Sequence, residues 1–93
     1  FENRLEMLRN RIDELDSELL EILASRVEIV KQIGKYKKEH NVTALQINRW
    51  SQLMDSRIKL GQKLDLNETL VKTFFQMIHE DSVRMQTEIM DSE

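Results

Sequence analysis

One periodic run over residues 4–38 constrains what this chain can fold into. Its apolar residues recur at alternating steps of three and four, at Leu5, Leu8, Ile12, Leu15, Leu19, Ile22, Ile29 and Ile33. That spacing places them on one face of a helix with a 3.5-residue repeat. The chain has no proline, and no glycine interrupts the run before Gly34. We therefore predict a first helix over about residues 3–40.

The predicted helix is too long for a compact chain of 93 residues. About 35 residues at 1.5 Å each extend over roughly 52 Å, whereas a compact chain of this length has a radius of gyration of about 12 Å. A lone copy would leave much of the apolar stripe in water. We therefore predict a partner chain, most simply a second copy related by a two-fold axis.

Composition indicates a small helical domain and excludes several kinds of site. Charged residues make up 33% of the chain, which together with the lack of proline favours an all-α class. Without cysteine there is no disulfide, thiol nucleophile or cysteine-based zinc site. Two glycines are too few for a dinucleotide-binding or phosphate-binding loop. His40 and His79 have no partner at metal-ligand spacing, so we expect both at the surface.

Charge and hydropathy bear on partners and location. The net charge of −3 argues against nucleic acid as the main partner. No apolar run approaches the roughly 18 residues needed to span a membrane, and we recognise no secretory leader. We expect a cytoplasmic protein, and the start at Phe1 rather than Met suggests an excised domain or a processed form.

Two more helices are predicted after the first. A break at residues 40–43, with Thr43 as N-cap, precedes a second helix over about residues 44–60, which Gly61 would end. Asn67 would cap a third helix over about residues 67–90, with Glu68 in its first turn. Residues 1–93 thus form one domain of three helices.

Arg26 stands where the repeat of the first helix calls for an apolar residue. A guanidinium on an apolar seam is costly unless an anion meets it. Lys37 follows eleven residues later, which returns within about 20° of the same direction and about 16 Å along the axis. Both long side chains can therefore converge on one ligand. Arg9 lies about 25 Å before Arg26 and could join them only from the partner of an antiparallel dimer.

Polar residues of the later helices complete a candidate site. Gln46 and Arg49 are neighbours on one helix face, and Ser82 and Gln86 lie one turn apart within the apolar stripe of the third helix. Taken singly, such residues are more commonly a solvated edge or bonded to backbone. Together they would form a cationic pocket that holds a small dianion and stabilises developing negative charge. The cluster comprises Arg26, Lys37, Gln46, Arg49, Ser82, Gln86 and the partner's Arg9.

These residues resemble the pattern of the all-helical chorismate mutases, the intertwined dimeric type. The similarity runs nearly end to end, from LRNRIDELDSELLEILASR through IGKYK and NR to HEDSVRMQ. The joint spacing of these segments carries it, rather than any single one. The resemblance implies an all-α fold whose three helices, one of them very long, form an intertwined homodimeric bundle.

The resemblance also implies a reaction, the cofactor-free Claisen rearrangement of chorismate to prephenate in the shikimate pathway of aromatic amino-acid biosynthesis. Arg26 and the partner's Arg9 would hold the two substrate carboxylates, a contact at which arginine can be bidentate. Lys37 and Gln86 would donate to the ether oxygen as its bond to carbon breaks. Ser82 would assist at a carboxylate.

Two positions depart from the family pattern. The family usually has an aspartate where this chain has Gln46 and a glutamate where it has Trp50, and these acids help bind the substrate hydroxyl. Gln46 can still donate and accept, whereas Trp50 offers only an N–H donor. Arg49 would support the pocket beside Lys37. Trp50 motivates an alternative, a catalytically weak regulatory module that binds prephenate or chorismate.

Two further alternatives concern assembly. The segment LQINRW resembles the subgroup fused to a deoxy-heptulosonate phosphate synthase domain, in which the mutase domain can regulate its neighbour by binding prephenate. A purely structural helical dimer is the other alternative. In that case Arg26 would pair with an internal acid such as Glu21 or Glu80.

Overall fold

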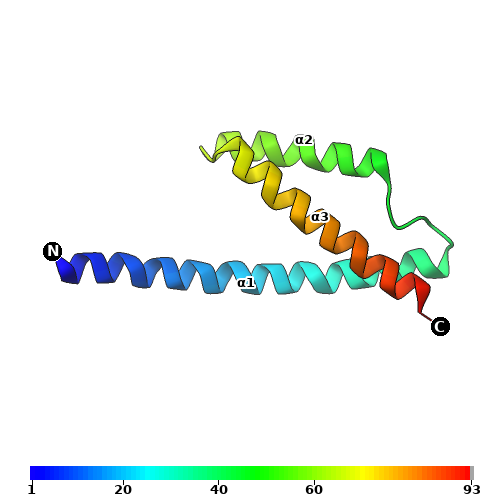
Figure 1. The fold of residues 1–93 in the computed structure, drawn as a ribbon, viewed down its shortest axis with the longest axis horizontal. Coiled ribbons are helices and arrows are strands. Elements are labelled where there is room, and N and C mark those ends of the chain that lie inside the picture. The colour runs from blue at the N-terminus through cyan, green and yellow to red at the C-terminus, as the bar shows by residue number, and fades with distance from the viewer. Residues whose placement is uncertain (93) are drawn as a thin grey trace.

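The computed structural model describes residues 1–92, which form three helices (Figure 1). They are α1 (Glu2–Glu39), α2 (Ile47–Lys63) and α3 (Glu68–Asp91), and this part of the chain contains no strand. The predicted all-α class with three helices and a very long first helix is therefore confirmed. None of these helices is both long enough and apolar enough to cross a membrane.

α3 packs against both other helices, whereas α1 and α2 do not pack against each other. Figure 1 shows α3 running obliquely from the end of α2 to the C-terminal half of α1, while the N-terminal half of α1 extends beyond the rest. The described chain measures 59 × 28 × 14 Å and has a radius of gyration of 17.1 Å. A compact chain of this length would have a radius of gyration of about 12 Å.

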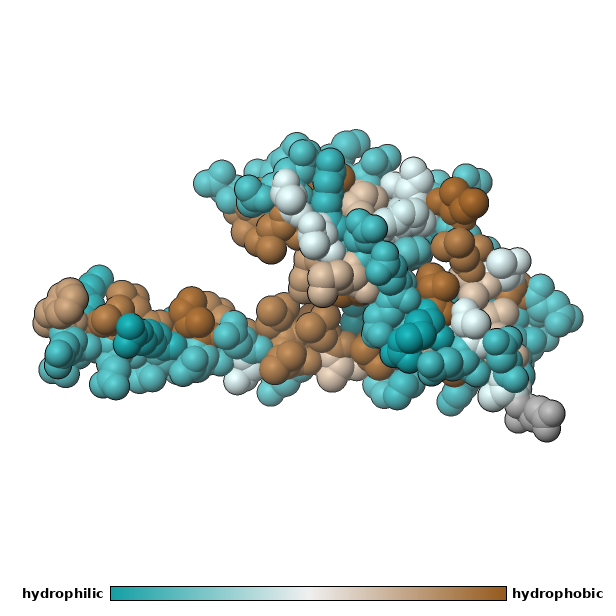
Figure 2. All heavy atoms as spheres, in the orientation of Figure 1, coloured by the Kyte–Doolittle hydropathy of each residue, from teal (hydrophilic) through white to brown (hydrophobic). Residues whose placement is uncertain are grey.

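The apolar stripe on the projecting half of α1 is exposed. Leu8 is 54% exposed, Ile12 57% and Leu19 45%, and Figure 2 shows hydrophobic residues along one edge of this projecting half. The buried apolar core of residues 1–92 is small and comprises Val30, Leu53 and Val71. An exposed apolar surface of this length is typical of a face that packs against another chain.

α2 begins and ends three residues later than we expected from the sequence. Gln46 rather than Thr43 is its N-cap, and the helix continues through Gly61, which is therefore not a stop signal. A Cβ atom at position 61 would lie 2.8 Å from Val71 Cγ2, so the glycine permits the close approach of α2 and α3. The chain turns after the helix at Asp65, whose φ of 58° lies in the left-handed region.

The loop before α2 is attached to the end of α1. The Val42 amide donates to the Lys37 carbonyl oxygen at 2.9 Å, and Lys37 Nζ donates to the Ala44 carbonyl oxygen at 2.7 Å. These two bonds hold residues 42–44 against α1, which explains why α2 begins only after them.

α3 has the N-cap that the sequence predicted. Asn67 Oδ1 accepts a hydrogen bond of 3.0 Å from the Leu70 amide, one of the free N–H groups of the first turn. Farther along, α3 lies close to α1 at Gly34, where a Cβ atom would be 3.3 Å from the Gln86 Cα. The glycine therefore lets the backbone of α3 approach α1 at the level of Gln86.

Candidate functional site

A cavity of about 290 Å³ lies between the C-terminal half of α1, the start of α2 and the middle of α3. Its polar lining includes most of the site residues proposed from the sequence: Arg26, Lys37, Gln46, Arg49, Ser82 and Gln86. Its apolar walls comprise Val30, Ile33, Ala44, Leu53 and Val83. None of the lining residues is acidic, so the cavity carries a net positive charge.

Helical spacing explains why these side chains converge. Arg26 and Lys37 line the cavity from one face of α1, as their separation of eleven residues predicted. Ser82 and Gln86 line it from one face of α3, one turn apart, and are only 6% and 7% exposed. The two polar residues in the stripe of α3 are therefore at the cavity rather than on a solvated edge.

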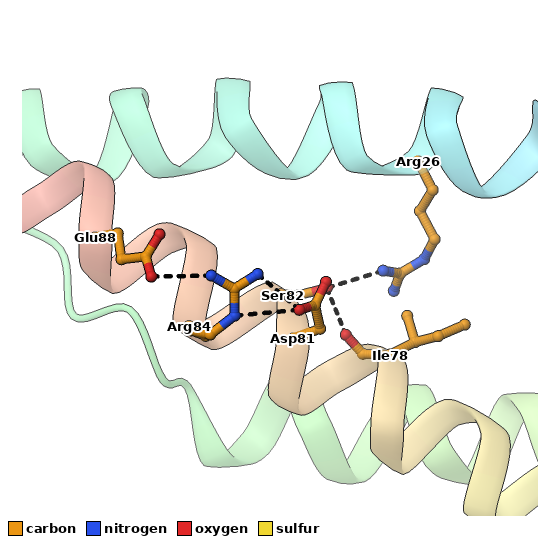
Figure 3. Close-up of polar contacts among 6 residues, drawn as sticks. All are labelled: Arg26, Ile78, Asp81, Ser82, Arg84 and Glu88. Atoms are coloured by element: carbon orange, nitrogen blue, oxygen red, sulfur yellow. Dashed lines mark hydrogen bonds and ion pairs between the residues drawn. The ribbon is translucent and has the colours of Figure 1, made fainter.

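The Arg26 guanidinium forms no ion pair with a carboxylate of residues 1–92. Its Nη1 donates a hydrogen bond of 3.0 Å to Ser82 Oγ, and this hydroxyl donates to the Ile78 carbonyl oxygen at 2.8 Å (Figure 3). Burial, followed by repulsion from Arg57 and Arg49, lowers the pKa of Arg26. A bound anion would offset all three effects.

Acidic groups of α3 are engaged away from this guanidinium. Asp81 Oδ1 accepts from Arg84 Nη2 at 2.8 Å, and Glu88 Oε1 accepts from Arg84 Nη1 at 2.9 Å (Figure 3). Neither Glu21 nor Glu80 forms an ion pair with the guanidinium within the described chain. A purely structural role for the arginine therefore lacks the internal acid that it requires.

Lys37 and Gln86 both present hydrogen-bonding capacity to the cavity. Lys37 Nζ has one of its three N–H groups directed to the Ala44 carbonyl oxygen, and burial lowers the pKa of this ammonium group. Gln86 Oε1 is buried without a hydrogen-bond partner in residues 1–92. A buried polar atom without a partner is uncommon and is consistent with a group that a ligand completes.

His79 lines the cavity, although we had expected it at the surface. Its ring stacks on Trp50, with ring centroids 3.9 Å apart and an interplanar angle of 20°. Trp50 does not itself line the cavity and reaches it only through this stack. His79 precedes Ser82 by three residues and Gln86 by seven, which is the spacing of one helix face, and this count could have located it from the sequence.

The charge state of His79 follows from its surroundings. Burial is the main cause that lowers its pKa below the usual 6.5, and Arg26 and Lys37 lower it further against the opposing effect of Glu80. The imidazole is therefore neutral at pH 7, with one donor and one acceptor nitrogen.

Arg9 is exposed on the projecting half of α1 and does not line the cavity. The roughly 25 Å of helix that separates it from Arg26 cannot be spanned within one copy. Of the residues proposed from the sequence, Arg9 and Trp50 are thus the two that one chain does not bring into the lining.

The arrangement suits binding and charge stabilisation. Three cationic side chains and two amides surround the space, and no carboxylate of residues 1–92 lines it to act as a base. No cluster of three or more metal-ligating side chains occurs within residues 1–92. Such a cavity can hold a small dianion and stabilise negative charge that develops on a bound oxygen.

Comparison with known proteins agrees with this geometry. A family model described as chorismate mutase type II matches residues 8–87. The bifunctional chorismate mutase/prephenate dehydratase of Escherichia coli (strain K12) is 36% identical over 89 residues, which are 96% of this chain and 23% of that protein. The protein of the same name from Buchnera aphidicola subsp. Acyrthosiphon pisum (strain APS) is 31% identical over 88 residues, 95% of this chain and 23% of that protein.

A relative of similar length is the 4-amino-4-deoxychorismate mutase of Streptomyces venezuelae. It is 27% identical over 92 residues, 99% of this chain and 89% of that protein. The chain therefore spans 23% of the two bifunctional relatives and most of the third. Those two combine the mutase with a prephenate dehydratase, not with the deoxy-heptulosonate phosphate synthase suggested by LQINRW.

Proposed function

We propose, from the premise that this chain belongs to the chorismate mutase type II family and is thus an isomerase domain, that its cavity rearranges chorismate to prephenate. The observation that carries the proposal is the Arg26 guanidinium, which lies at the cavity without a carboxylate partner in residues 1–92. Chorismate is a compact ring compound with two carboxylates, the kind of ligand that would supply the missing negative charge.

Each lining group has a part in this mechanism. Arg26, with Ser82 beside it, holds one carboxylate through charge-assisted hydrogen bonds. The ether carbon–oxygen bond breaks as a new carbon–carbon bond forms within the same molecule, so no proton transfer is required. Lys37 and Gln86 donate to the ether oxygen as it gains negative charge, and Arg49 adds positive potential. The enclosing apolar walls favour the folded conformer in which the two carbon ends meet.

The proposed active unit is an intertwined homodimer. A second groove, of about 340 Å³, runs between α1 and α3 and is bordered by Arg26 and Ser82, which it shares with the cavity. The other groove residues are mainly apolar: Leu23, Val27, Phe74, Met77, Ile78, Asp81 and Met85. The projecting half of α1 carries an exposed apolar stripe of matching character. Seating the partner's α1 in this groove would bring Arg9 of the partner subunit toward the second substrate carboxylate.

The decisive experiment follows chorismate absorbance after addition of the purified chain, without metal or cofactor, with sedimentation velocity on the same sample. We expect chorismate to be consumed, prephenate to form and the chain to sediment as a dimer. Well-folded protein that neither consumes nor binds chorismate would overturn the proposal. A stable monomer that is fully active would remove the role of the partner's Arg9.

A regulatory module is the second candidate, because Trp50 stands where the family usually has an acid and is covered by His79. Calorimetric binding of prephenate without turnover at high protein concentration would favour it. The LQINRW resemblance supports a fused synthase domain that such a module would regulate, whereas the two bifunctional relatives support a prephenate dehydratase. The full-length sequence of the protein decides between them, and fractionation of cells tests the cytoplasmic location that we propose.

A further inference from the structure

We propose that His79, held against Trp50, recognises the ring hydroxyl of the substrate and makes the cavity reject a substrate with a ring ammonium group instead. This role rests on the chorismate mutase function proposed above. It concerns a residue of α3 and a residue of α2 that meet at the edge of the cavity.

The position of His79 suits contact with a ligand. It lines the cavity from the same face of α3 as Ser82 and Gln86. The Trp50 indole covers one face of the imidazole at a centroid distance of 3.9 Å, which fixes the plane of the ring. The ring nitrogens of His79 make no hydrogen bond within residues 1–92, unlike Nδ1 of His40, which lies 2.9 Å from the Tyr36 carbonyl oxygen.

The other acceptors of the cavity are already engaged, are exposed, or belong to a group placed for another part of the substrate. Ser82 Oγ already accepts from Arg26, and the Ala44 carbonyl oxygen already accepts from Lys37. Gln86 Oε1 has no partner in residues 1–92, but its amide is buried where it would meet the ether oxygen in the proposed mechanism, and the amide of Gln46 is exposed. A neutral imidazole supplies one acceptor nitrogen.

The charges around His79 favour that neutral form. From α1, Arg26 and Lys37 oppose its protonation, and from α2 Arg49 adds a third cation to the lining. Glu80, its neighbour on α3, acts in the opposite direction but does not line the cavity. The same excess of positive charge would repel a ring ammonium group, and no carboxylate in the lining could neutralise it.

The names of the relatives include two substrates that this cavity should distinguish, chorismate and 4-amino-4-deoxychorismate. The Streptomyces venezuelae relative is named for 4-amino-4-deoxychorismate, a compound with an amino group in place of an oxygen substituent. A cavity with a neutral imidazole and no acid should prefer the hydroxyl compound. The lining cations would disfavour the amino compound even if His79 only packed on Trp50, so the comparison of chorismate with its hydroxyl-free analogue is what separates hydroxyl recognition from packing.

The chain offers a matched control for a histidine exchange within an aromatic stack. Tyr36 and His40 stack with centroids 4.1 Å apart and an interplanar angle of 22°, and His40 does not line the cavity. His79→Phe keeps a ring on Trp50 and removes both nitrogens, and His79→Gln restores an acceptor. His40→Phe makes the same exchange away from the cavity.

The experiment measures kcat/KM of these variants for chorismate, for its analogue without the ring hydroxyl and for 4-amino-4-deoxychorismate. We expect His79→Phe to lower kcat/KM for chorismate about tenfold, the usual worth of one hydrogen bond, and to leave the hydroxyl-free analogue unchanged. His79→Gln should recover most of the loss, and His40→Phe should resemble wild type. Wild type should prefer chorismate over the amino compound, and His79→Glu should shift the preference toward it.

Equal effects of His79→Phe on chorismate and on the hydroxyl-free analogue would overturn the role, as would no effect on either. If His79→Phe melts well below wild type, His79→Leu replaces it in the same comparison. If wild type binds chorismate without turnover, the catalytic proposal fails, and the ratio of Kd values for chorismate and the hydroxyl-free analogue tests His79 instead. Loss of that ratio in His79→Phe supports the role, and an unchanged ratio refutes it.

Discussion

Replacing Arg26 with leucine should separate the stability of this fold from its chemistry. The guanidinium makes one hydrogen bond, to Ser82, and the hydroxyl keeps its own bond to the Ile78 carbonyl oxygen when the arginine is removed. The loss is therefore about 1.5–3 kcal/mol for one charge-assisted bond, with no buried donor left unpaired. Three gains oppose this loss. The substitution removes a partly buried charge, it ends the repulsion from Arg57 and Arg49, and it places a leucine on an apolar seam.

A leucine contributes about 1.5–3 kcal/mol when fully buried and less at this half-buried position. With the relief of charge it offsets most of the loss, so the free energy of unfolding should change by no more than about 2 kcal/mol. The effect on chorismate should be larger. Removing a charge-assisted contact to a substrate carboxylate costs up to about 3 kcal/mol, or roughly a hundredfold in kcat/KM.

The assay combines urea unfolding, followed by circular dichroism, with chorismate consumption at matched concentrations of folded protein. Arg84→Leu is the control, because Arg84 of α3 does not line the cavity, is exposed, and within residues 1–92 bonds only to Asp81 and Glu88. Its activity should equal that of wild type. If Arg26→Leu lost several kcal/mol of stability while its folded fraction kept full activity, the arginine would be a structural ion-pair partner and our reasoning would be wrong.

Three further outcomes follow. Lys37→Ala should lower kcat by about a hundredfold, the worth of one transition-state donor, and near-normal turnover would remove Lys37 from the mechanism. Gly61→Ala should destabilise the chain, since its Cβ would lie 2.8 Å from Val71 Cγ2. Overpacking costs about 1–3 kcal/mol against about 1 kcal/mol of gained helix propensity. In a Val71→Ala background the same exchange should instead be stabilising, and a urea titration reads the sign. Because the pKa of His79 is lowered in the folded chain, wild-type stability should be complete above about pH 6.5 and fall as the pH drops through the folded pKa. The His79→Phe variant should lose less stability than wild type over the same fall in pH, and parallel stability profiles of the two proteins would contradict this.

Local pattern predicted the features that helix geometry fixes. The 3.5-residue repeat gave a first helix that extends from Glu2 to Glu39, and the eleven-residue spacing put Arg26 and Lys37 on one cavity. Asn67 could be recognised as a cap because its partner amide lies three residues away. Each of these depends on residues close in the chain or on one helix.

The features that the sequence did not predict depend on contacts between different helices and loops. Gly61 resembled a helix stop, but its role depends on Val71 of the facing helix. Thr43 was a plausible cap from the sequence, but Lys37 of α1 bonds to the Ala44 carbonyl oxygen and holds this part of the loop against α1. His79 was judged as a lone histidine, and the stack with a tryptophan of another helix, which orients it, has no sequence signal. The role of Arg9 stays a prediction, because it needs a second copy.

The projecting half of α1 has a genetic consequence under the proposed dimer. Each active site would take the projecting half of α1, with Arg9, from one copy and its other residues from the second copy. Two defective alleles could therefore complement each other. A chain lacking the Arg9 side chain and a chain lacking the Arg26 side chain would each be inactive alone. In their mixed dimer both lesions fall in the same site and leave the other site whole. Co-expression would then restore about a quarter of the normal activity, because half of the dimers are mixed and half of their sites are intact.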